Sequence, residues 1–288
     1  MNVEDIKNIL IIGSGTMGQQ IGLLFAANGY DVVLYDISDD ILNNAYNRIV
    51  KLSGSMVKAG KYSKSDMENA LSRIRLTSIP EKAAENADLI NESAPENPEL
   101  KGKIFGMFHQ LCKPETVFTT NTSSLLPSMF AQASGRPERL CALHFHDVLL
   151  TNVVDVMPHP GTSPEIVELV KAFAEKNNLL PIVLNKEHSG YVFNFMFMAF
   201  LSSALTLAQR EVAPISEIDN AWTGVMHTKS GPFAIMDAIG LDTVCTITTA
   251  RAEKTGDKQG KANALFLKEY VNAGKLGIKS GQGFYTYK

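Results

Sequence analysis

A glycine-rich motif near the N-terminus has the residue types and spacing to bind the phosphates of a dinucleotide. It reads Gly13-Ser14-Gly15-Thr16-Met17-Gly18 and directly follows the apolar run of residues 8–12, which predicts a buried strand. The first glycine permits a tight turn, Gly15 lets a pyrophosphate approach the backbone, and Gly18 lets a following helix pack closely on the strand. The N–H groups at the start of that helix attract phosphate. We therefore expect the dinucleotide to contact Gly13, Gly15, Thr16, Met17 and Gly18.

An acidic residue, Asp36, indicates which dinucleotide is bound. It ends the second predicted strand, residues 31–36, at about the distance from the glycine motif where an acidic residue binds ribose. A carboxylate there accepts hydrogen bonds from both ribose hydroxyls and repels a 2′-phosphate, and residues 37–40 contain no arginine to bind that phosphate. The pattern favours NAD over NADP. The alternatives are FAD, or a glycine turn that serves packing alone.

Further along the chain, three segments carry side chains suited to proton transfer and hydrogen bonding. Ser123 lies in the segment Asn-Thr-Ser-Ser-Leu of residues 121–125, His144 lies in Leu-His-Phe-His-Asp of residues 143–147, and Asn194 lies near the start of an apolar helix. An oxidation that takes a hydride from a carbinol carbon must also remove the hydroxyl proton. An imidazole with a pKa near neutrality is suited to accept that proton.

Taken in order, these motifs resemble those of the 3-hydroxyacyl-CoA dehydrogenase family over essentially the whole chain. The resemblance implies a Rossmann-type N-terminal domain, a helical C-terminal domain that dimerises, and NAD-dependent oxidation of a 3-hydroxyl group. It also rests on the following segments: Ala94–Asn97 with Lys101, Gly231-Pro232-Phe233 with Asp237, Gly240-Leu241-Asp242, and the glycine-rich tail at residues 277–285.

The resemblance also implies roles for individual residues. His144 matches the family's catalytic base. Asp155 stands where the family has a glutamate that orients this base; the alternative is that Asp155 is a surface carboxylate on an edge strand. Ser123 and Asn194 match positions that contact the substrate and polarise its 3-oxygen by donating hydrogen bonds without adding charge; otherwise they are helix caps. Three charged residues match positions around the cofactor, unless they are merely solvated: Glu96, Lys101 and Lys279. Asp147 stands where the family has an asparagine near the nicotinamide.

Two regions depart from the family pattern. From its base onward the family usually reads His-Phe-Phe-Asn-Pro, whereas this chain has His146 and Asp147 at the third and fourth positions and no proline. His144 and His146 would face the same side of a strand, where a third ligand such as Asp147 or His159 could complete a metal site. Hydride transfer to NAD needs no metal, and we expect none.

The second departure concerns the acyl-CoA. Leu52 and Ala59 stand where the family often has a serine and a lysine that contact it. Residues that could compensate lie close by in the sequence: Lys51, Ser53, Lys58 and Lys61.

Strands and helices alternate in the first part of the chain, and helices alone follow. This order predicts a mostly parallel α/β sheet domain over residues 1–186 and an all-α domain over residues 187–288. The predicted strands are 8–12, 31–36, 87–93, 116–121, 139–146, 152–158 and 179–185. The predicted helices are 16–29, 38–59, 63–74, 98–111, 163–178, 190–209, 214–226, 231–255 and 262–273.

Composition and charge exclude several classes of protein. The 288 residues include 27 Lys and Arg against 30 Asp and Glu, a net charge of −3, which argues against nucleic acid as a partner. Hydrophobic residues make up 45%, as in an ordinary globular protein. The three dispersed cysteines and the absence of a secretory signal favour a cytoplasmic protein with reduced thiols. The apolar run at residues 191–208 is expected to be a buried or dimer-interface helix, not a membrane span.

We therefore predict an NAD-dependent 3-hydroxyacyl-CoA dehydrogenase for short chains, active as a homodimer formed through its C-terminal domain. The lost CoA positions and the altered segment from His144 to Asp155 keep open a dehydrogenase of a free 3-hydroxy acid, such as a sugar acid or a carnitine-like compound. A third possibility is a catalytically idle NAD-binding protein.

Overall fold

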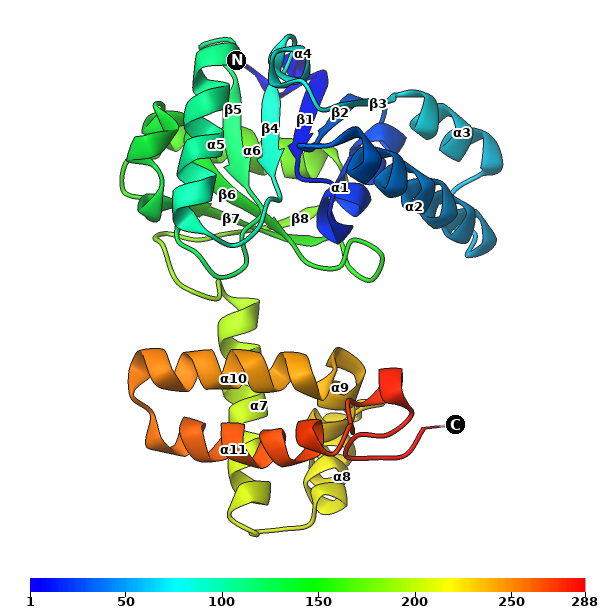
Figure 1. The fold of residues 1–288 in the computed structure, drawn as a ribbon, viewed down its shortest axis with the longest axis vertical. Coiled ribbons are helices and arrows are strands. Elements are labelled where there is room, and N and C mark those ends of the chain that lie inside the picture. The colour runs from blue at the N-terminus through cyan, green and yellow to red at the C-terminus, as the bar shows by residue number, and fades with distance from the viewer. Residues whose placement is uncertain (288) are drawn as a thin grey trace. The chain divides into compact units, whose positions relative to one another are not determined.

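A single eight-stranded sheet organises the first of two units in the computed structural model, which describes residues 1–287 (Figure 1). This unit is Met1–Val192, and its strand order is β3-β2-β1-β4-β5-β6-β7-β8. All neighbouring strands are parallel except β6 and β7. The predicted mostly parallel Rossmann-type sheet is thereby confirmed. The strands are β1 (Asn8–Ile12), β2 (Asp31–Tyr35), β3 (Ile74–Thr77), β4 (Leu89–Glu92), β5 (Val117–Thr120), β6 (Leu140–Phe145), β7 (Val153–Pro158) and β8 (Leu180–Val183).

Helices cover both faces of this sheet because its central strands are apolar on both sides. Alternate residues of β1 point to opposite faces. Ile9 and Ile11 therefore belong to one core, with Phe25 of α1, and Leu10 belongs to the other, with Phe105 of α5. The helices of this unit are α1 (Thr16–Ala27), α2 (Asp39–Lys58), α3 (Lys64–Ser72), α4 (Pro80–Ala84), α5 (Pro98–Leu111) and α6 (Pro164–Lys176).

The structure corrects the sequence interpretation around Ile74. Residues 63–74 were expected to form one helix, but α3 ends at Ser72 and Ile74 begins the short strand β3. The backbone of β2 offers an open edge, and Ile74 pairs with Val32 there. The hydrogen bonds of the sheet therefore outweigh the local preference for helix. The five-residue helix α4 was not expected either.

Helices make up most of the second unit, Phe193–Lys288, as expected. They are α7 (Phe193–Gln209), α8 (Ile215–Met226), α9 (Pro232–Ile239), α10 (Leu241–Thr255) and α11 (Lys258–Asn272). The prediction of one helix over residues 231–255 is wrong, because Gly240 adopts φ +102° and separates α9 from α10 at an angle of 102°. Within residues 1–287 no single helix has the length and apolar character to cross a membrane, although the bent pair α9 and α10 meets that test jointly.

Helix α7 is buried along only part of its surface. Leu201 and Leu205 lie in the core of the second unit, whereas Phe195 and Met196 are exposed. One face of α7 is therefore buried, as expected of a core helix, and other apolar side chains of α7 are exposed.

Candidate active site

The glycine loop joins β1 to α1 at the point where the strand order of the sheet reverses, which is where open α/β sheets bind ligands. Gly13 has φ +95°, and a Cβ atom on it would lie 2.7 Å from the carbonyl oxygen of Ser93. A Cβ on Gly18 would lie 1.9 Å from the carbonyl oxygen of Gly13, so helix and strand meet here as closely as the motif predicts. A Cβ on Gly15 would meet nothing within 4 Å, and no side chain caps the N-terminus of α1. The loop therefore has the open, N–H-lined space that a pyrophosphate needs.

Asp36, directly after β2, lies against this loop. Its Oδ2 accepts hydrogen bonds from the backbone N–H of Ser14 (2.8 Å) and the Ser14 hydroxyl (2.7 Å), and its Oδ1 accepts one from Ile37 N–H (2.8 Å). A carboxylate has about four acceptor positions, so it retains capacity for ribose hydroxyls. The cofactor residues Gly13 to Gly18 and Asp36 are thus brought together, in an arrangement that fits NAD. Sequence reasoning missed the anchoring role of Ser14.

A buried histidine–aspartate pair crosses the antiparallel ladder of β6 and β7. His144 and Asp155 are direct cross-strand partners, and His144 Nδ1 lies 2.9 Å from Asp155 Oδ2. The two residues are 4% and 1% exposed, so solvent does not screen their interaction. Because directly opposed residues have closely spaced Cβ atoms, the short aspartate side chain reaches the ring.

A second imidazole contacts the same carboxylate. His146 Nε2 lies 3.1 Å from Asp155 Oδ2, and the rings of His144 and His146 meet edge to face with centroids 4.8 Å apart. Burial raises the pKa of Asp155, but its hydrogen bond to His144 and its close contact with His146 outweigh burial and hold that pKa below its usual range. The third member of the cluster is therefore Asp155, not Asp147 or His159. Asp147 accepts a hydrogen bond from Leu149 N–H, and both ring nitrogens of His159 bond to backbone groups.

The His144 ring is held from its face by Tyr191. The two rings stack with centroids 4.5 Å apart and an interplanar angle of 8°. The buried Tyr191 hydroxyl donates a hydrogen bond to the carbonyl oxygen of Thr122 (2.5 Å), which ties the stack to the end of β5. No residue within 1–287 forms a hydrogen bond with His144 Nε2, so that nitrogen is available for another partner. No sequence signal identified Tyr191, because stacking across 47 positions leaves no local pattern.

Ser123 lies beside a network of charges at the ends of β4 and β5. Glu96 accepts hydrogen bonds from the Ser123 N–H (2.9 Å) and the Thr122 hydroxyl (2.7 Å). Burial raises the pKa of Glu96, but the Thr122 hydrogen bond and the charge of Lys101 outweigh burial and lower it. Lys101 is itself fully buried, 2.6 Å from Glu92 and 3.6 Å from Glu96. Its ammonium therefore supports the loop that carries Glu96, and the buried Glu92 is a member that sequence reasoning missed.

The remaining predicted residues belong to the second unit. Asn194 is half-buried in the first turn of α7. The exposed Lys279 forms an ion pair with Asp242 at 2.6 Å.

A pocket of about 300 Å³ adjoins the glycine loop between α1 and α2. It is lined by Thr16, the first residue of α1, and by Arg48, Lys51 and Leu52 of α2. Of the residues that could compensate for the lost CoA contacts, Lys51 reaches this pocket. Ser53 instead donates to the carbonyl oxygen of Val50 and Lys61 to that of Leu149.

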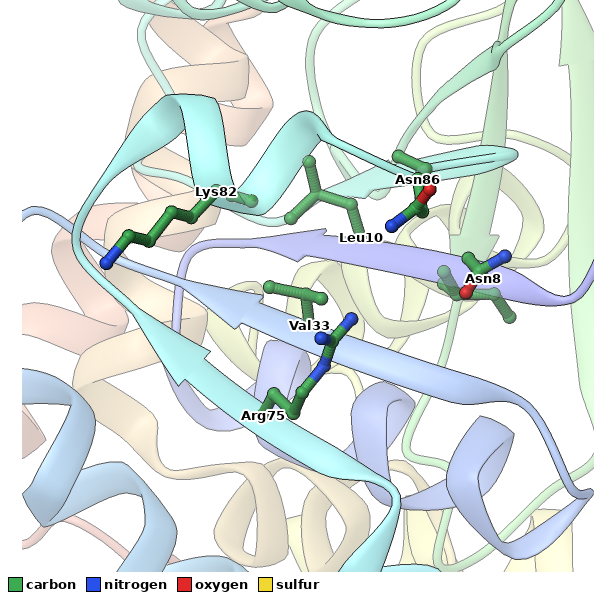
Figure 2. Close-up of a pocket in the computed structure, with 9 residues that line it drawn as sticks. Asn8, Leu10, Val33, Arg75, Lys82 and Asn86 are labelled. Atoms are coloured by element: carbon green, nitrogen blue, oxygen red, sulfur yellow. The ribbon is translucent and has the colours of Figure 1, made fainter.

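A smaller pocket lies under α4 and is unrelated to these groups (Figure 2). Leu10, Val33 and Arg75 line it from β1, β2 and β3, and no predicted site residue reaches it.

Two models of one known protein family together match nearly the whole chain. The family model for the 3-hydroxyacyl-CoA dehydrogenase NAD binding domain matches residues 8–188, and that for the C-terminal domain matches residues 190–287. The chain is 32% identical to a probable 3-hydroxybutyryl-CoA dehydrogenase of Bacillus subtilis, over 99% of this chain and 98% of that protein. It is 30% identical to the mitochondrial hydroxyacyl-coenzyme A dehydrogenase of Homo sapiens, over 98% of this chain and 92% of that protein.

Two solved structures are similar over the whole length. A diketoreductase, described as performing substrate-directed dual catalysis of dicarbonyl compounds, is 34% identical with a TM-score of 0.91 over 98% of this chain and 99% of that chain. The (S)-3-hydroxybutyryl-CoA dehydrogenase of Ralstonia eutropha is 28% identical with a TM-score of 0.87 over the same shares.

Proposed function

The chain belongs to the 3-hydroxyacyl-CoA dehydrogenase family, whose members interconvert 3-hydroxyacyl-CoA and 3-oxoacyl-CoA with NAD, and on that premise we propose that it acts on short acyl chains such as 3-hydroxybutyryl-CoA. The names of relatives support a short acyl chain, since the relative from Bacillus subtilis is named a probable 3-hydroxybutyryl-CoA dehydrogenase.

His144 is the base of this reaction. The observation that carries the proposal is the buried pair of His144 and Asp155, with Nε2 of the ring left available. Asp155 accepts the Nδ1 proton of His144, which leaves Nε2 as the acceptor of the substrate's hydroxyl proton. The carboxylate then stabilises the imidazolium. When bound, NAD supplies the acceptor for the hydride that leaves C3.

Ser123 and Asn194 donate hydrogen bonds to the 3-oxygen of the substrate. The Ser123 backbone is fixed by its N–H bond to Glu96. Glu96 in turn contacts the cofactor, and the buried Lys101 is a positioning residue that holds Glu96 in place. The cofactor is bound further by Gly13, Gly15, Thr16, Met17, Gly18 and Asp36, and by Asp147 and Lys279.

The CoA moiety has cationic side chains to meet it despite the two lost contact residues. Arg48 and Lys51 line the pocket beside Thr16 and can pair with the phosphates of CoA.

One observation favours a second candidate, a dehydrogenase of free ketones or 3-hydroxy acids. The similar solved structure with a TM-score of 0.91 is a diketoreductase, whose dicarbonyl substrates are named without CoA.

The test is NADH oxidation, followed by absorbance, with acetoacetyl-CoA and free acetoacetate at matched concentrations. Turnover with the thioester alone is expected. Turnover with acetoacetate alone would replace the proposal by the second candidate. Bound NADH with no turnover of either substrate would favour an idle NAD-binding protein.

The second domain, residues 187–288, supplies substrate contacts and a homodimer interface, while residues 1–186 bind NAD. The exposed apolar side chains of α7, Phe195 and Met196, support an interface there. Light scattering of the purified chain should give twice the monomer mass, and a monomer at micromolar concentration would refute the interface.

The three unpaired thiols support a cytoplasmic location.

A further inference from the structure

His144 of β6, His146 directly after β6, and Asp155 of β7 bring three metal-ligating atoms together. One ligand atom of each residue lies within 4.8 Å of the others. His144 is buried, Asp155 is 1% exposed, and His146 keeps 15% of its side chain exposed. We propose that these three residues bind a divalent transition metal ion, Zn²⁺, and that its binding inactivates His144 as a base.

The backbone explains why the three side chains converge. His144 lies on β6, and His146 directly follows that strand with its Nε2 3.1 Å from Asp155 Oδ2. Asp155 is the direct partner of His144 on β7 and therefore points into the same space. The pairing of the two strands therefore fixes His144 and Asp155, and the start of the β6–β7 connection supplies His146.

The distances are close to those that zinc requires. Zinc binds imidazole nitrogen at about 2.0–2.1 Å and carboxylate oxygen at about 2.0–2.2 Å, usually in a tetrahedron, which places neighbouring ligand atoms about 3.3–3.5 Å apart. Asp155 Oδ2 lies 2.9 Å from His144 Nδ1 and 3.1 Å from His146 Nε2. A movement of a few tenths of an ångström would widen each of these two oxygen–nitrogen distances to the separation of neighbouring zinc ligands. Rotation of the histidine side chains would bring the two ring nitrogens to the same separation from each other.

The chemistry of these groups also suits the ion. Two imidazoles and one carboxylate are ligands typical of zinc sites with three protein ligands and one open position. The carboxylate offsets part of the ion's charge, which a buried site requires. The partly exposed His146 gives the ion a route from solvent.

The effect on the reaction follows from the tautomer of His144, and this part rests on the proposed function. To bind Zn²⁺, Nδ1 must give up its proton to solvent, and its hydrogen bond to Asp155 is replaced by a bond to the metal. The neutral ring then carries its proton on Nε2. That nitrogen becomes a donor and cannot accept the hydroxyl proton of the substrate, so bound Zn²⁺ inhibits.

Equilibrium dialysis of the untagged chain against Zn²⁺ tests the site without any assay of turnover. One equivalent should bind to the wild type. His146→Phe should weaken binding by more than about 100-fold, since even an outer-shell partner of a metal ligand contributes 10–100-fold. His227→Asn removes an exposed histidine of the second unit, and Cys245→Ser removes the cysteine that is not fully buried. Both controls should bind Zn²⁺ as the wild type does.

Inhibition is measured next, on wild-type chain whose NADH affinity and far-UV circular dichroism are normal. Zn²⁺ at the concentration that fills the site should abolish NADH oxidation, and a chelator should restore it. No bound equivalent, equal binding by wild type and His146→Phe, or loss of binding in Cys245→Ser would overturn the site. Full turnover with Zn²⁺ bound would overturn ligation through His144 Nδ1. Absence of turnover before any metal is added would refute the proposed function and leave the dialysis result standing.

Discussion

Replacing Asp155 by asparagine removes the charge that faces His144 while it keeps the size of the side chain. The carboxylate is 1% exposed and 2.9 Å from the ring, so its hydrogen bond to the imidazolium is not weakened by water. Hydrogen bonds to charged groups contribute about 1.5–3 kcal/mol. At about 1.4 kcal/mol per factor of ten, Asp155→Asn should lower kcat by roughly 10- to 150-fold. The loss grows further if the asparagine N–H₂ turns toward Nδ1, because that reverses the tautomer of the ring.

The assay is steady-state oxidation of NADH by acetoacetyl-CoA, with NADH affinity measured separately by fluorescence. Asp155→Glu serves as the matched variant, because it keeps the charge and changes only the length. It should retain more activity than Asp155→Asn. The reasoning fails if Asp155→Asn turns over at the wild-type rate, or if both variants fold, bind NADH and lose the same activity. In the second case the fit of the side chain, and not its charge, is what His144 requires.

Three further predictions concern the base and the cofactor loop. His144→Ala should lower kcat by about 10²–10⁴-fold with NADH affinity nearly unchanged; equal rates in steady-state assays would exclude His144 as the base. Asp36→Ala should raise the KM for NADH by about tenfold or more, because it removes charge-assisted hydrogen bonds to ribose, and lower the KM for NADPH, because it removes the charge that repels the 2′-phosphate. A wild-type preference for NADPH would contradict this. Gly18→Ala should reduce the free energy of unfolding in urea by about 1–3 kcal/mol, since its Cβ would lie 1.9 Å from the Gly13 carbonyl oxygen; unchanged stability would show that the loop can relax.

The sequence alone determines the cofactor loop and the order of the elements. Gly13, Gly15 and Gly18 act within one turn and the start of one helix, so their spacing along the chain is also their spacing in space. The alternation of strands and helices in residues 1–186 likewise predicts a parallel sheet, because each strand needs a helix to return the chain. The ends of most of these elements lie within one to three residues of the predicted positions.

Tertiary structure decides the partners of His144. The sequence indicates that His144 and His146 share a face, but the register of β6 against β7 places Asp155 between them. Stacking of Tyr191 on His144 depends on where the chain returns after β8. The strand β3 exists because β2 has a free edge, and the break at Gly240 follows from φ +102° in the folded chain. Contacts between residues distant in sequence depend on strand register and chain path, and no local pattern of residue types encodes either.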